Sequence, residues 1–159
     1  MARILEINHS EPIGKTLMLL TQTSRLISKY IDAYFYQKAN ISFTKFMALK
    51  VLASGNGVMN PTQLAEWTQT ELHNITTLVA RLKKDGLVYT NRSDIDNRKV
   101  NVILTDKGRK VLSEATPVAK ELIDKIMSSI TKTDAVELSK MLEVLRDNAY
   151  IGLESITKS

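Results

Sequence analysis

The chain has 159 residues and no cysteine, which excludes disulfide bonds, thiolate metal sites and a nucleophilic or redox-sensing cysteine. No apolar run approaches the ~20 residues that a membrane span needs, and charged residues interrupt the first ten positions, so we expect an unexported, cytoplasmic protein with no membrane partner. The formal net charge is +5, and residues 81–110 alone hold nine Lys or Arg against four Asp. This segregation favours a polyanionic partner, although charge alone also fits a solvated basic face.

Two helices are expected in the first third of the chain. Residues 13–39 contain glycine only near their start and carry apolar side chains at helical spacing, which predicts one long helix. Ser42 is a suitable N-cap for a second helix over about residues 43–53. The run Gly55-Asn56-Gly57 is expected to end that helix.

A short third helix and a fourth helix should follow after a tight turn. Asn60-Pro61-Thr62-Gln63 combines a capping residue, a proline at the first helical position and a glutamine at the third, which predicts a helix start. The fourth helix is expected to begin near Thr70 or Glu71 and to end at Asp85-Gly86, where glycine can adopt the left-handed cap.

The sequence period then changes from helical to extended. Residues 87–92 and 99–104 predict two strands joined by a hairpin over residues 93–98. Thr105-Asp106 should cap a fifth helix that is kinked at Pro117. A last helix is expected from about Thr133-Asp134, with a capping box between Asp134 and Glu137.

The order of these elements predicts a mainly α fold with a small β-hairpin wing, because two short helices followed directly by a basic hairpin are typical of a winged helix-turn-helix. We expect residues 1–40 and 111–159 to serve dimerisation and residues 41–110 to form the winged domain. We therefore expect double-stranded DNA as the partner of this domain. The alternative is a winged-helix module for protein association, which would have no reason to concentrate its net positive charge here.

The DNA-contacting residues are expected at the start of the fourth helix and on the hairpin, where short polar and basic side chains can reach bases or phosphates. Asn74 suits adenine and His73 can donate to guanine, although each alone also fits a solvent-facing position. Arg98 is expected to enter the minor groove, with Asp96 either bracing the wing or serving as an ordinary turn residue. The predicted set is Thr62, Glu71, His73, Asn74, Thr76, Thr77, Arg81, Lys84, Arg92, Asp96, Arg98 and Lys99.

Four stretches of the sequence resemble the MarR family of bacterial transcription regulators: residues 62–66 (TQLAE), 78–88 (LVARLKKDGLV), 96–99 (DNRK) and 104–108 (LTDKG). The resemblance implies an obligate dimer with interlocked terminal helices, placed on a pseudo-palindromic operator and acting as a repressor by occluding a promoter. It also implies the minor-groove role of Arg98 and the bracing role of Asp96. The chain departs from the family pattern at Thr77, where an arginine is frequent.

The terminal segments carry more apolar surface than a thin winged domain can cover, which predicts a homodimer, the alternative being a larger monomeric core. The candidate interface residues are Ile4, Leu5, Leu122, Ile126, Leu138, Met141, Leu145, Ile151 and Leu153.

Six of the nine aromatic residues fall between residues 30 and 46, where they are usually core. The family resemblance implies a second reading, a small aromatic effector held between the dimer helices and the winged domain. Tyr34, Phe46, Met47 and Trp67 are the expected lining, and Pro117 the flexing point.

An enzyme is not expected, because the sequence shows no constellation that carries catalysis. His9 and His73 are the only histidines, and neither a phosphate-cradling glycine loop nor metal-ligand spacing is present. We therefore expect no catalytic residue, no metal and no cofactor.

Overall fold

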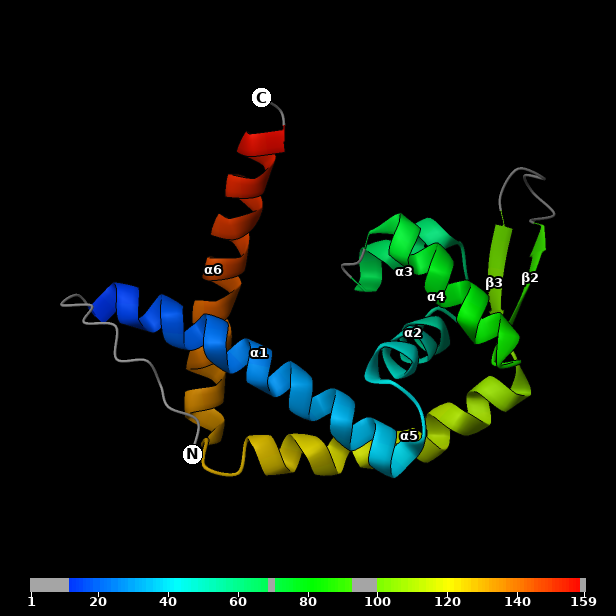
Figure 1. Cartoon of the computed structure of the whole chain (residues 1–159), viewed down its shortest axis with the longest axis horizontal. Coiled ribbons are helices and arrows are strands. Elements are labelled where there is room, and N and C mark those ends of the chain that lie inside the picture. The colour runs from blue at the N-terminus through cyan, green and yellow to red at the C-terminus, as the bar shows by residue number, and fades with distance from the viewer. Residues whose placement is uncertain (1–11, 69–70, 93–99, 158–159) are drawn as a thin grey trace. The chain divides into compact units, whose positions relative to one another are not determined.

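The computed structural model describes residues 12–68, 71–92 and 100–157, which form six helices and three short strands (Figure 1). The elements are α1 (Pro12–Ala39), α2 (Phe43–Ser54), β1 (Val58–Met59), α3 (Pro61–Thr68), α4 (Leu72–Lys84), β2 (Val88–Arg92), β3 (Val100–Leu104), α5 (Asp106–Ile126) and α6 (Lys132–Thr157). The chain divides into two compact units, residues 1–122 and 123–159. The expected fold class is confirmed, whereas the domain boundaries at residues 40 and 110 stay predictions.

Side-chain caps start α2 and α3 where the sequence predicts them. The hydroxyl of Ser42 accepts a hydrogen bond from the backbone N–H of Lys45 at 3.3 Å. Asn60 and Gln63 form a reciprocal capping box: the Asn60 side chain accepts from the Gln63 N–H at 2.9 Å, and the Gln63 side chain accepts from the Asn60 N–H at 3.0 Å. Each cap satisfies backbone donors that the helix leaves unpaired.

The sheet has one strand more than the sequence predicts. β1 is only two residues long and pairs antiparallel with β3, Val58 opposite Ile103 and Met59 opposite Val102. β3 in turn pairs antiparallel with β2, which gives the order β1-β3-β2. The positive φ of 83° at Gly57 lets the chain turn from α2 into β1, since glycine adopts this conformation without steric cost.

Three residues fix the junction between α4, the sheet and α5. Gly86 has φ 73° directly after α4, as expected for a left-handed cap. The Thr105 hydroxyl accepts from the Gly108 N–H at 3.0 Å, which caps α5 as predicted. Gly108 passes so close to the backbone of Leu87 that a β-carbon there would collide with the Leu87 carbonyl oxygen.

The core of the first unit lies among α1, α2, α3, α4 and the sheet. α3 contacts both α2 and α4, and α4 contacts β2, which stands beside the end of that helix in Figure 1. The largest fully buried side chains of this core are Phe35, Phe46, Leu49, Leu52, Leu64, Ile75, Leu82, Val88 and Val102. This packing holds α4 rigidly by one side.

Of the two C-terminal helices, only α6 differs from the expectation. α5 is one helix that contains Pro117, as the sequence predicts, and the kink at this proline stays a prediction. α6 begins at Lys132 and is capped by Thr131 and Asp134 rather than by Asp134 and Glu137. The Thr131 hydroxyl accepts a hydrogen bond from the Asp134 N–H at 3.1 Å, and the Asp134 carboxylate accepts one from the Thr131 N–H at 3.2 Å. These two residues therefore form the capping box. None of the helices described is long and apolar enough to cross a membrane.

Candidate nucleic-acid interface

α4 has one side in the core and the other in solvent. Ile75, Leu78, Val79 and Leu82 are buried, and their spacing puts His73, Thr77 and Lys84 on the opposite side of the helix. The predicted residues that α4 and its N-cap contribute are all exposed: Glu71, His73, Asn74, Thr76, Thr77, Arg81 and Lys84. We call this exposed surface the α4 outer face.

Local contacts leave some groups of the α4 outer face free for a ligand and engage others. The hydroxyls of Thr76 and Thr77 donate to the carbonyl oxygens of Leu72 and His73, at 3.0 and 3.3 Å. The imidazole Nδ1 of His73 lies 3.2 Å from a Glu71 carboxylate oxygen, an ion pair only when the histidine is protonated. The α4 outer face therefore offers acceptor lone pairs, methyl groups and an imidazole to its surroundings.

The basic side chains of α4 are engaged to different degrees. Lys83 donates to the hydroxyl of Thr90 at 3.1 Å, which ties it to β2. Arg81 makes neither a hydrogen bond nor an ion pair with any other residue in the described part of the chain. Its guanidinium is available to an external anion.

The remaining predicted contacts lie on α3 and the wing. Thr62 is exposed in the first turn of α3, and Arg92 is exposed at the last position of β2, opposite Val100. Asp96, Arg98 and Lys99 lie outside the described residues, so their roles stay predictions.

A cavity of about 380 Å³ opens beside the α4 outer face, and we call it the α4 cavity. α4 lines it with Asn74, Thr77, Leu78 and Arg81, the start of α2 with Ser42, Thr44 and Lys45, and α1 with Asp32. The contributions of α1 and α2 were not predicted from the sequence. Thr44 and Lys45 follow a recognisable N-cap, but nothing local indicates that this helix start adjoins α4.

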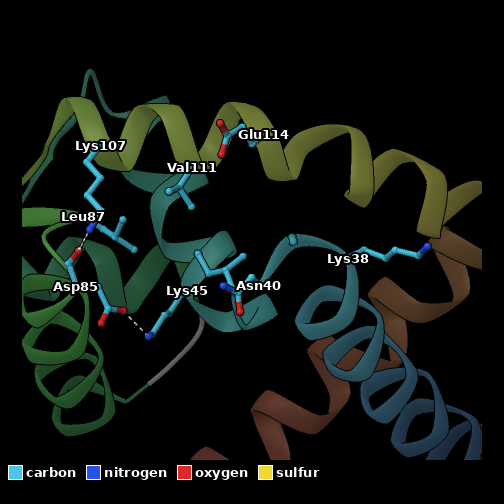
Figure 2. A pocket seen from close by; sticks show the side chains of 10 residues that line it. Lys38, Asn40, Lys45, Asp85, Leu87, Lys107, Val111 and Glu114 are labelled. Atoms are coloured by element: carbon cyan, nitrogen blue, oxygen red, sulfur yellow. Dashed lines mark hydrogen bonds and ion pairs between the residues drawn. The ribbon is translucent and has the colours of Figure 1, made fainter.

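A second cavity, of about 680 Å³, lies between the end of α1, the start of α2, the end of α4 and α5 (Figure 2). We call it the lysine cavity because Lys38, Lys45 and Lys107 line it, together with Ala39, Asn40, Ile41, Asp85, Leu87, Val111 and Glu114. Figure 2 shows Lys45 and Lys107 converging on Asp85. Lys45 reaches its carboxylate at 2.5 Å and Lys107 its backbone carbonyl at 2.7 Å.

The aromatic effector pocket expected from the sequence stays a prediction, although two of its residues lie in the core. Phe46 is 2 % exposed and packs against Phe35, with ring centroids 4.9 Å apart, while Tyr34 is buried next to Tyr30. These rings fill the core because α1 and α2 press their apolar sides together. Neither cavity is lined by Tyr34, Phe46, Met47 or Trp67, and Trp67 is 68 % exposed.

The predicted dimer residues fall into three groups. Leu138, Met141, Leu145, Ile151 and Leu153 are exposed on α6, a helix described over its whole length that buries none of its side chains. Ile126 is half-buried, and Leu122 is only 3 % exposed because its own chain covers it, which makes it a poor interface candidate and corrects that prediction. Ile4 and Leu5 lie outside the described residues.

The fold and the α4 outer face define a winged helix-turn-helix transcription regulator. The chain belongs to the family described as "Transcriptional regulator SarA/Rot", whose sequence profile matches residues 28–115.

Within the described residues, no group of three or more His, Asp or Glu side chains is arranged to hold a metal ion.

Three known proteins illustrate this relationship. The transcriptional repressor IacR of Pseudomonas putida is 29% identical over 112 residues, which cover 70% of this chain and 66% of IacR. The organohalide-sensing regulator RdhR-CbdbA1625, solved with 2,4-dichlorophenol, has a TM-score of 0.78 at 27% identity and covers 93% of this chain and 87% of its own. The MarR family regulator Sco3205 of Streptomyces coelicolor, solved with DNA, shares the fold at a TM-score of 0.80 and 20% identity, over 85% of this chain and 86% of its own.

Proposed function

We propose that this regulator binds a pseudo-palindromic DNA site as a homodimer and represses transcription by occupying it. The observation that carries the proposal is the α4 outer face: a helix anchored in the core by one side presents His73, Asn74 and Thr77 to solvent, with Arg81 and Lys84 behind them. A helix of this kind fits the major groove, where its first turns reach base edges and its basic residues reach phosphates. The name of IacR supports repression rather than activation.

Within this site the residues have separate roles. Asn74 reads adenine through its amide, which makes no hydrogen bond with another described residue, and His73 donates to a guanine acceptor. Lys84 and Arg92 neutralise phosphates on either side of the groove. Arg98 enters the minor groove from the wing, as the family resemblance implies.

The dimer is supported by the apolar surface of α6. A helix with this many exposed large apolar side chains and no buried one does not stay uncovered in a stable protein. A second copy is the partner that also supplies a second α4 for the second half of a palindrome.

The lysine cavity is a second candidate effector site beside the aromatic pocket expected from the sequence. Its volume is typical of small-molecule sites, which span about 300–1,000 Å³. Three lysines against Asp85 and Glu114 give the lining a net positive charge, and Ile41, Leu87 and Val111 add apolar surface, which together favour a small anion with an apolar body. The ligand bound to RdhR-CbdbA1625, a phenol, is of the expected size. To release DNA, such a ligand must bind the DNA-free state more tightly.

The proposal assigns the protein no catalytic reaction and places it in the cytoplasm, because a repressor acts where its DNA is. The test is retention of genomic fragments by the purified protein at two salt concentrations, followed by footprinting. We expect one dimer to protect a pseudo-palindrome, with affinity falling as salt rises. If no fragment is retained even at low salt, a protein-association module becomes the better description.

A further inference from the structure

Among the described residues, the α4 cavity brings together a cation and a hydroxyl donor that have no other partner. Arg81 has no partner among the described residues, in contrast to Lys45, Lys83 and Lys107, which are engaged. The hydroxyl of Thr44 also makes no hydrogen bond within the described chain. A guanidinium and a neutral donor around one cavity match a ligand that only accepts hydrogen bonds and carries negative charge.

The position of the α4 cavity indicates where that ligand comes from. An α-helix with its side chains is about 10–12 Å wide and the major groove about 12 Å, so a helix in the groove has a sugar-phosphate strand along each flank. Asn74 and Thr77 line the α4 cavity and belong to the α4 outer face as well. One flank of α4 therefore borders the α4 cavity, on a side where a sugar-phosphate strand would run if α4 lay in the major groove.

We propose that the α4 cavity receives one phosphate group of the operator backbone in each half-site, with Arg81 as its main counter-charge and Thr44 as a donor from α2. This inference rests on the proposed function and deepens it. It adds the start of α2 to a contact surface that the sequence places only on α3, α4 and the wing. A phosphate contact fixes the register of the protein along the DNA duplex, so this contact determines which bases Asn74 faces.

Two charged residues modulate the phosphate site. Lys45 lines the α4 cavity, but its ion pair with Asp85 fixes its position and offsets most of its charge, so Arg81 remains the main cation. Asp32 on α1 also lines the α4 cavity and repels a phosphate. Replacing Asp32 with asparagine should therefore strengthen DNA binding, the opposite of what loss of a structural contact would do.

The experiment uses the full-length dimer and a footprinted operator duplex, with each phosphate of one half-site replaced in turn by an uncharged methylphosphonate. We expect one position whose replacement weakens the wild type about tenfold, as loss of a charged hydrogen bond does. Arg81→Gln removes the contact from both half-sites, so it should weaken binding to unmodified DNA about a hundredfold, and the methylphosphonate at that position should cause the variant no further loss. Thr44→Val should weaken binding less, at the same position. Lys120→Gln, which removes an exposed cation of α5 outside both cavities, should respond to each duplex as the wild type does.

The outcomes separate this inference from the proposed function. Suppose that the wild type binds the operator, but that the loss of affinity from Arg81→Gln multiplies with the loss from every methylphosphonate. The α4 cavity then holds no phosphate, and this inference fails while the proposed function stands. If no DNA is bound, both fail. Saturable binding of inorganic phosphate without DNA, lost in Arg81→Gln, would reassign the α4 cavity to a free anion.

Discussion

The ammonium group of Lys45 lies 2.5 Å from a carboxylate oxygen of Asp85, and this ion pair joins the first turn of α2 to the residue that ends α4. The two residues are 40 positions apart in the sequence. Lys45 borders both the α4 cavity and the lysine cavity, so the pair forms part of the wall between them. It fixes the end of the helix that we assign to DNA.

Breaking this pair should lower the free energy of unfolding by about 1 kcal/mol, the upper end of the range for surface ion pairs, because the two side chains are only 25% and 40% exposed. Lys45→Met tests this in urea unfolding, and a double-mutant cycle with Asp85→Asn isolates the pair. The matched control is Lys110 with Glu114, whose charges are 4.0 Å apart and well exposed. A coupling energy as small as that of the control would contradict the prediction.

Gly108→Ala should destabilise the winged domain by about 1–3 kcal/mol, the usual cost of overpacking, because the new methyl group meets the carbonyl oxygen of Leu87. Gly152→Ala on α6 is the control: nothing lies within 4 Å of a β-carbon there. Alanine is the better helix former by about 0.5–1 kcal/mol, so this variant should be more stable. The urea midpoints of unfolding of Gly108→Ala and Gly152→Ala test these two expectations. Equal shifts for the two would mean that Gly108 is not tightly packed.

Met141→Glu should convert the dimer to monomers, since it puts a charge into the exposed apolar surface of α6 that we expect a second copy to cover. Light scattering after size-exclusion chromatography gives the mass. Ser139→Glu adds the same charge at a polar position of the same helix and should leave the dimer intact. Retention of a dimer by both variants would place the interface elsewhere.

Arg98→Ala should weaken DNA binding most at sites with A/T-rich flanks, where the minor groove is narrow and its potential most negative. Lys84→Ala should weaken binding to all sequences alike and lower the slope of log affinity against log salt by about 1 per subunit. Titrations against a set of duplexes with different flanks distinguish the two. Losses from Arg98→Ala that do not depend on the flank would remove its minor-groove role.

Much of the fold was predictable because its signals are local. The Ser42 cap, the Asn60 and Gln63 capping box and the left-handed Gly86 each depend on residues within a few positions, so the sequence places the helix ends. The cap of α6 was predicted one turn too late because Thr131 and Asp134 offer the same kind of signal as the pair that we chose. β1 escaped prediction because two residues carry no period, and they become a strand only by pairing with β3.

The sequence by itself determined the class of protein, the side of α4 that faces outward and the concentration of positive charge around it, since periodicity and composition are properties of the chain. Only the tertiary structure decided what surrounds the cavities. It buried Phe46 and Tyr34 in the core, although the sequence allowed them to line a pocket. It also brought Thr44 and Asp32 beside Arg81. Such neighbours come from the packing of α1 and α2 against α4, and no local pattern encodes which distant residues that packing brings together.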